Sequence, residues 1–154
     1  MKKRKNFVYI IIGILILILS IYSLRNGHNV LNKESYVIFE NQKKVKVEIA
    51  DNDKERTYGL MNREKLDYNS GMIFIFNDEK IRNFWMKNTL IPLDIIFVDS
   101  NLTIVNIANA EPCKSDPCSL YNSEKETKYV IEVNLGYTKD NRILTGQKIK
   151  LFNI

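Results

Sequence analysis

A dense apolar run at residues 84–97 constrains the fold of this chain more than any other segment. It contains the only tryptophan, Trp85, and places Lys87 and Asp94 among apolar neighbours. Apolar residues at this density are typical of a pair of buried strands, and charges inside such a run are costly unless they are paired. The run therefore predicts that Lys87 and Asp94 either find partners in the fold or face a cavity that uses them.

Short strands separated by turns are the pattern of the chain after residue 35. Residues 44–49 show it most clearly, because Val45, Val47 and Ile49 alternate with charged residues, as in a half-buried strand. The other expected strands cover residues 36–39, 72–76, 81–86, 94–98, 102–108, 129–133 and 148–152. Turns are expected at 77–79 and 99–101, and a loop containing both cysteines at 109–127.

Helix is expected only in short pieces. Asp51 or Asn52 can cap a helix that ends near Tyr58, with Gly59 in a left-handed conformation behind it. Further helical turns are expected at 64–68 and 136–141. Strands and helices do not alternate as a parallel sheet requires. The pattern predicts a mostly β fold, a small antiparallel β-barrel or strongly curled sheet of about eight short strands with one or two short helices.

The N-terminus has the pattern of a membrane anchor. Four basic residues at positions 2–5 precede residues 7–24, which carry no charge and approach the length of about 20 residues that crosses a bilayer. We expect residues 1–25 to anchor a single-pass protein of the cell membrane, with residues 26–35 as a linker and 36–154 as the domain. The basic flank predicts a cytoplasmic N-terminus and an extracytoplasmic domain. The alternative is a cleaved signal segment and a secreted protein, although no A-x-A-like cleavage site is present.

The net charge of +5 does not indicate nucleic-acid binding. Five basic residues and no acid lie within residues 1–28, so the remaining 18 Lys and Arg equal the 18 acidic residues. The excess charge is therefore a topology signal, and no nucleic-acid partner is expected.

Several motifs of the domain resemble one known family. They are Arg56, Arg63, Gly-Leu-Met at 59–61, Gly-Met at 71–72, Phe74, Phe76, Phe-Trp-Met-Lys-Asn-Thr at 84–89, Pro-Leu-Asp at 92–94, Pro-Cys at 112–113 and 117–118, Tyr-Val-Ile-Glu at 129–132 and Gly136. These motifs resemble the family called domain of unknown function 192. The resemblance implies a small β-barrel-like fold, usually behind a signal or membrane anchor in bacterial members. It implies no established activity, substrate or cofactor.

Cys113 and Cys118 are the only cysteines, and in an extracytoplasmic domain they predict a disulfide. A redox-active pair is disfavoured, because the spacing is not C-x-x-C and no helix follows. Zinc would need two more ligands, and the single histidine, His28, lies in the linker. The remaining alternative is a Cu(I) site formed by the thiols with Met61, Met72 and Met86. Methionines in apolar strands are usually core residues, so we expect no metal and no cofactor.

A domain without histidine excludes a Ser-His-Asp triad and a Cys-His pair. Phosphate-binding glycine loops and a G-x-S-x-G elbow are also absent from the sequence. The candidate site residues that remain are Trp85, Lys87, Asn88, Asp94, Arg56, Arg63 and Glu132.

These candidates allow structural and functional roles. Asp94 buried alone would have a raised pKa, as an acid or base requires, whereas beside Lys87 or Arg63 it would be a structural tie. Glu132 alternates with apolar residues, so it either points outward or lines a pocket. Trp85 is either a core residue or, with Lys87, an aromatic rim for a sugar or peptide.

We therefore expect a non-catalytic module that binds a small polar ligand or an envelope protein. The alternatives are a hydrolase or lyase acting on envelope material, with Asp94 as acid or base, and a purely structural domain. Asp94→Asn and Lys87→Met distinguish a tie, which lowers the melting temperature, from a site, which loses function.

Overall fold

The computed structural model describes residues 12–22 and 34–154, and the chain divides into two units at residue 33. In the first unit, residues 12–22 form a helix. Among the described residues, no helix is both long and apolar enough to cross a membrane. The ends of the expected anchor and most of the expected linker lie outside the described residues, so the boundaries at 25 and 35 stay predictions.

The second unit, Glu34–Ile154, is mostly β. Its strands are β1 (Tyr36–Phe39), β2 (Lys44–Ala50), β3 (Ser70–Lys80), β4 (Asn83–Trp85), β5 (Leu93–Val98), β6 (Ile104–Ala110), β7 (Leu120–Asn122), β8 (Thr127–Asn134) and β9 (Ile149–Phe152). Its two short helices are α2 (Asp53–Tyr58) and α3 (Tyr137–Asp140).

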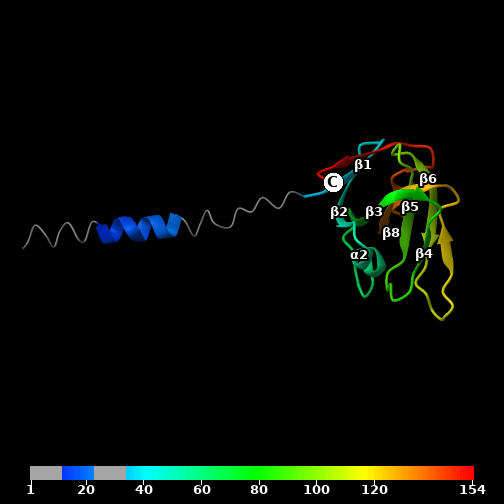
Figure 1. The fold of residues 1–154 in the computed structure, drawn as a ribbon, viewed down its shortest axis with the longest axis horizontal. Coiled ribbons are helices and arrows are strands. Elements are labelled where there is room, and N and C mark those ends of the chain that lie inside the picture. The colour runs from blue at the N-terminus through cyan, green and yellow to red at the C-terminus, as the bar shows by residue number, and fades with distance from the viewer. Residues whose placement is uncertain (1–11, 23–33) are drawn as a thin grey trace, which may run out of the picture. The chain divides into compact units, whose positions relative to one another are not determined.

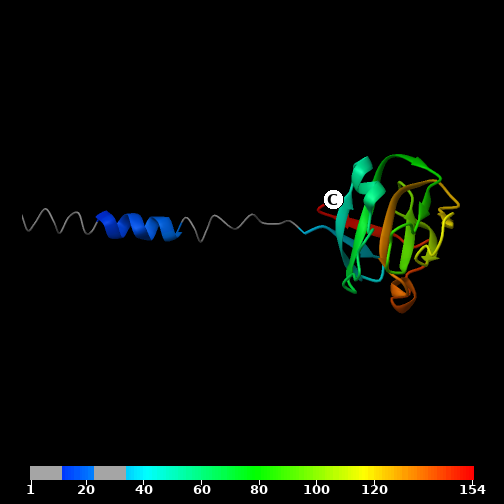
Figure 2. The ribbon, with the colours of Figure 1, turned by 90° about the horizontal axis from the view of Figure 1, so that it is seen from below.

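Seven of the strands form one strongly curled sheet in the order β6-β5-β8-β3-β2-β1-β9, and β4 pairs only with β7 (Figures 1 and 2). The curl brings the two edges of the large sheet together at one end. Thr103 bridges Lys148, and the Ile104 amide donates to the Gln147 carbonyl oxygen at 2.9 Å. The expectation of a mostly β, strongly curled sheet with few helices is confirmed, because this sheet is a half-barrel.

The expectation of a purely antiparallel sheet is wrong for one pair of strands. β2 and β3 run parallel, with Lys46 opposite Ser70 and Ala50 opposite Phe74. Parallel neighbours require a crossover of about a dozen residues or more, and the segment containing α2 supplies it. The alternating apolar pattern of a strand does not show the direction of its partner.

Three local expectations also differ from the structure. Residues 77–79 continue β3 and do not form a turn, residues 64–68 are not helical, and β7 lies in the segment expected to be a loop. Gly59 ends α2 with a positive φ of 50°, but its ψ of −133° is outside the left-handed helical region. Of the two expected caps, Asp51 and Asn52, the structure has Asn52, whose side chain accepts from the Glu55 amide at 3.0 Å.

The two faces of the sheet carry separate apolar clusters. Ile73 and Ile131 belong to one cluster, whereas their sequence neighbours Phe74 and Val130 belong to the other. The second cluster also contains Leu60 and Met86, which lie outside the large sheet. This face is therefore covered by the chain that follows α2 and by the segment that follows β4, and the candidate site lies beneath this cover.

Candidate functional site

Asp94 is completely buried on β5, and its carboxylate is a structural centre. One oxygen accepts from Asn109 Nδ2 at 2.6 Å and from the Gly136 amide at 3.2 Å. The other accepts from the Thr138 amide at 2.9 Å and from Thr138 Oγ1 at 2.7 Å. Neither Lys87 nor Arg63 pairs with it, so the expected ionic tie is wrong. Asp94 instead fastens the start of α3 to β5 and has no surface with which to contact a ligand.

The two cations expected near Asp94 pair with other acids. Lys87 Nζ lies 3.0 Å from Asp116 of the cysteine loop, with the Lys87 side chain partly and the Asp116 side chain largely open to solvent. The Arg63 guanidinium makes two bonds to the Glu48 carboxylate, at 2.5 and 2.6 Å. Arg63 thereby holds the pKa of Glu48 below its usual value. Both pairs fasten surface segments to each other.

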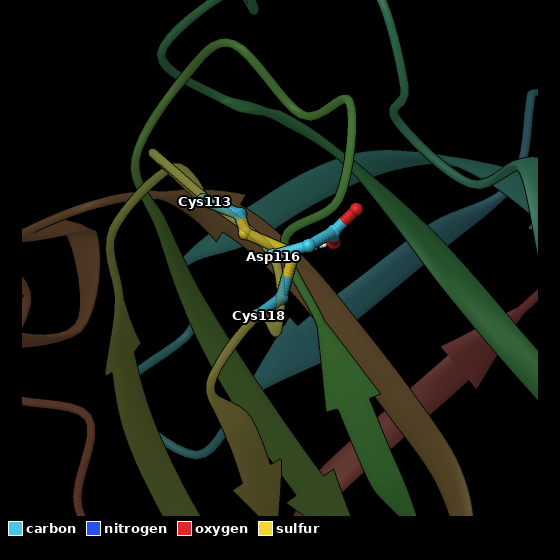
Figure 3. A group of neighbouring side chains, drawn as sticks. All are labelled: Cys113, Asp116 and Cys118. Atoms are coloured by element: carbon cyan, nitrogen blue, oxygen red, sulfur yellow. Dashed lines mark hydrogen bonds between the residues drawn. A yellow bond between two sulfur atoms is a disulfide. The ribbon is translucent and has the colours of Figure 1, made fainter.

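Cys113 and Cys118 form the expected disulfide (Figure 3). Asp116 lies between them in sequence, and its carboxylate lies near both sulfur atoms. Sulfur atoms joined to each other are not the thiolates that a Cu(I) site requires. Met72 and Met86, two of the three methionines considered for that site, are core residues of the second cluster.

Trp85 is not a core residue: its exposed fraction is 46%. Its neighbours Phe84 and Met86 pack into the second cluster, so the alternation places Trp85 on the outer side. Lys87 Nζ lies 5.7 Å from the centre of the Trp85 ring, as the aromatic-rim alternative expects. Asn88 is exposed with a φ of 57°, and its carbonyl oxygen accepts from the Asn62 amide at 2.8 Å. Asn88 therefore shapes the corner after Trp85, because asparagine tolerates this conformation.

Glu132 is an ionisable residue that is almost completely buried. It lies on β8 between Met72 of β3 and Ile95 of β5, and only 5% of its surface is exposed. Among the described residues, no hydrogen bond or ion pair reaches its carboxyl group. Burial without a partner raises the pKa of Glu132 to about 8. A carboxyl in this state keeps its proton at neutral pH.

A small cavity of about 30 Å³ lies against Glu132. We call it the Glu132 pocket. Its lining consists of Arg56, Thr57, Tyr58, Gly59, Leu60, Met61, Phe74, Phe84, Trp85, Thr89 and Glu132. The pocket is thus bounded by the end of α2 on one side and by β4 and the corner after it on another. A volume of this size accommodates one group about as large as a water molecule.

Thr89 and Gly59 are pocket residues that the candidate set does not contain. Thr89 is 8% exposed, and no hydrogen bond of its hydroxyl is present among the described residues. A Cβ atom added to Gly59 would lie 3.3 Å from the Phe74 ring, so this position is tight as well as conformationally special. The sequence shows both only as parts of motifs, because the burial of a hydroxyl depends on what packs over it.

Arg56 lines the pocket with a guanidinium whose N–H groups are already hydrogen-bonded. Its guanidinium donates to Asp53 at 2.6 Å and to the Ile75 carbonyl oxygen at 2.7 Å, and it lies 5.3 Å from the centre of the Phe76 ring. The structure therefore brings three of the predicted site residues, Arg56, Trp85 and Glu132, to one pocket. Lys87 lies beside Trp85, whereas Asn88, Asp94 and Arg63 have structural contacts elsewhere.

The domain is thus a mostly β half-barrel with a buried carboxyl beneath the segments that cover one face of its sheet. Residues 36–151 match the model of the uncharacterised ACR family also called domain of unknown function 192. The chain belongs to this family.

Relatives with known sequences and structures agree with this assignment. A UPF0127 protein of Pyrococcus abyssi is 34% identical over 110 residues, which cover 68% of this chain and 85% of that protein. Among solved structures, a Novosphingobium aromaticivorans protein of unknown function has 34% identity and a TM-score of 0.69, with 80% of this chain and 89% of that chain covered. A Sinorhizobium meliloti protein, described provisionally as a transcription regulator, has 31% identity and a TM-score of 0.69, with 77% and 92% covered.

Proposed function

We propose that this chain is a binding module of the cell envelope that recognises a small polar group in the Glu132 pocket. The observation that carries the proposal is Glu132 itself, a carboxyl group 5% exposed with no partner among the described residues and a cavity in front of it. Burial disfavours the charged form of this carboxyl and raises its pKa, and a ligand that pairs with the carboxylate offsets the cost of burying it.

The rim of the pocket supports a ligand larger than the pocket. Trp85 lies at the edge with nearly half of its surface exposed, and Lys87 lies beside its ring. An exposed aromatic face next to buried polar groups suits a sugar ring or a peptide side chain, which can stack on the ring while one polar group enters the cavity.

The place of action in this proposal is the outer side of the membrane. Its support is the uncharged segment at 7–24 with four basic residues before it, which favours an anchor with a cytoplasmic N-terminus. The partners would then be polar components of the envelope, either small molecules or proteins.

A second candidate is a hydrolase or lyase that uses Glu132 as a general acid. The observation that favours it is the pKa of about 8, because such a carboxyl can donate a proton at neutral pH. Asp94, the acid or base expected from the sequence, is enclosed by four donors and does not reach the pocket.

A ligand screen on the full chain in a non-ionic detergent tests the proposal. The panel contains envelope sugars and short peptides, and the readouts are the melting temperature and the fluorescence of Trp85, the only tryptophan. We expect a ligand whose effect is lost in Glu132→Gln and Thr89→Val but kept in Glu48→Gln, a control on the same face of the sheet.

The outcomes separate the candidates. Conversion of a panel member by the unmodified chain but not by Glu132→Gln would favour the enzyme. If no ligand of the panel gives a response that depends on Glu132, the binding proposal is contradicted and a structural role remains.

A further inference from the structure

We propose that the group recognised in the Glu132 pocket is a primary ammonium, such as the end of a lysine side chain or the amino group of an amino sugar. This inference rests on the proposed binding function and names its ligand chemistry. It is carried by the hydrogen-bonding groups around the cavity, by their charge and by the apolar walls.

Several residues that line the cavity carry hydrogen-bond acceptors. Glu132 offers two carboxylate oxygens, and the buried Thr89 hydroxyl offers a third oxygen. The last turn of α2 also ends here, and among the described residues no hydrogen bond reaches the carbonyl oxygens of Arg56 and Thr57. An ammonium group has three N–H donors and no acceptor, so it matches such a set. The carbonyl end of a helix also carries partial negative charge that favours a cation.

The one cation of the lining does not oppose this ligand. Arg56 pairs with the exposed Asp53, and its N–H groups already donate to Asp53 and to the Ile75 carbonyl oxygen. The remaining walls include the rings of Phe74, Phe84 and Trp85, whose faces attract cations. The cavity volume of about 30 Å³ fits an ammonium head and leaves the carbon chain of the ligand against Trp85.

Binding in this geometry couples to a proton. Before binding, the Glu132 carboxyl is protonated; on binding, its O–H bond breaks, the proton goes to water, and the carboxylate pairs with the ammonium. Of the groups packed around it, α2 supplies Arg56 and Tyr58, while β3 and β5 supply the neutral Met72 and Ile95.

The lining residues that the cover adds to these groups are uncharged: Leu60, Met61, Phe84, Trp85 and Thr89. Glu48 of β2 lies opposite Met72 of β3, on the same face of the sheet, and is paired with Arg63. Glu132 is therefore the group that titrates when the ligand enters, and affinity for an ammonium must rise with pH up to about 8.

Methylammonium chloride is the probe that tests this, with acetamide as a neutral probe of similar size and potassium chloride as the ionic-strength control. The full chain in non-ionic detergent is titrated at pH 6, 7 and 8, with Trp85 fluorescence as the readout. We expect the methylammonium concentration at half-saturation to fall about 50-fold from pH 6 to pH 8, because the ionised fraction of Glu132 rises by that factor. Glu132→Gln should abolish the response, and Glu48→Gln should keep it.

Other results would overturn the inference. A Glu132-dependent response to acetamide without one to methylammonium would reject the ammonium while the binding function stands. Methylammonium binding that is independent of pH, or unchanged in Glu132→Gln, would also reject it. If neither probe gives a response, the ammonium proposal is rejected. The panel of sugars and peptides then tests the binding function separately.

Discussion

Asp94 and Glu132 are both buried carboxyl groups on neighbouring strands, and their surroundings are opposite. Asp94 lies opposite Val133, whereas Glu132 lies opposite Ile95, so the two carboxyls point to different faces of the sheet. Asp94 accepts four hydrogen bonds, and Glu132 accepts none among the described residues. The first is therefore a structural acid, and the second is the residue available to a ligand.

Replacing Asp94 by asparagine should destabilise the domain by about 2–4 kcal/mol, because one amide N–H₂ would then face groups that are themselves donors. Lys87→Met should change stability by less than about 1 kcal/mol, because its pair with Asp116 is exposed. Urea unfolding of both variants measures the difference. Equal losses of stability would contradict the separate roles given to the two residues.

The raised pKa of Glu132 predicts a pH dependence of stability. Below pH 4.5 the carboxyl is protonated in the folded and unfolded chain; between about 4.5 and 8 only the folded chain keeps the proton. Unfolding then releases a proton, so this group lowers the free energy of unfolding as pH rises, with a slope approaching about 1.4 kcal/mol per pH unit. Above pH 8 its contribution no longer changes.

Glu132→Gln removes this dependence, so its stability should fall less between pH 5 and pH 8 than that of the unmodified chain. Chemical denaturation at several pH values measures both curves. Parallel curves would mean that Glu132 is ionised in the folded chain. Glu48→Gln is the matched control, because Arg63 pairs with Glu48 and the pKa shift there has the opposite direction.

At the scale of elements, the site depends on how closely β3 lies against β8. Gly71 begins the buried part of β3, opposite Val133 of β8 and Val47 of β2. A Cβ atom at this position would lie 2.4 Å from the Glu132 carbonyl oxygen, closer than real contacts allow. The glycine therefore permits the strand spacing that places the Glu132 side chain beneath α2.

Gly71→Ala should consequently destabilise the domain by about 3 kcal/mol or produce insoluble protein, because the backbone carbonyl of Glu132 and the side chains of Val133 and Val45 leave no room for the added methyl group. Ser70→Ala, at the adjacent residue of β3, is the control and should change stability by less than about 1 kcal/mol. Thermal unfolding and yield of soluble protein measure both. A stable Gly71→Ala variant would show that β3 and β8 can separate at this point.

At the scale of the whole molecule, the half-barrel is described by the structure, whereas the role of the N-terminal segment is a prediction from the sequence. Curling brings the two edge strands together at Thr103 and Lys148, and this protects part of each edge from pairing with other chains. The segment at 7–24 is instead a topology prediction from charge and hydropathy.

We expect the full chain to sediment with membranes, to resist extraction at alkaline pH and to keep its N-terminus. Intact mass after detergent extraction measures the N-terminus directly. A mature chain that starts beyond Arg25 would mean that the segment is a cleaved signal, and the domain would then be secreted.

The sequence alone determined the mostly β fold, seven of the strands to within two residues at either end, a cap of α2 at Asp51 or Asn52 and the disulfide. These features depend on period-two alternation, on local capping chemistry and on a single pair of cysteines, all of which act between residues close in the chain. The family motifs can also be read from the sequence, but they do not show what each residue contacts.

Only the tertiary structure decided which polar residues are structural and which are available. Asp94 found donors 15 to 44 residues away, Lys87 and Arg63 found other acids, and Trp85 came to the surface because Phe84 and Met86 took the inner side. Glu132 became buried because the segments after α2 and β4 cover the outer face of the sheet. Burial and pairing depend on residues distant in the chain, so no local pattern around Glu132 could show that it lies without a partner beside a cavity.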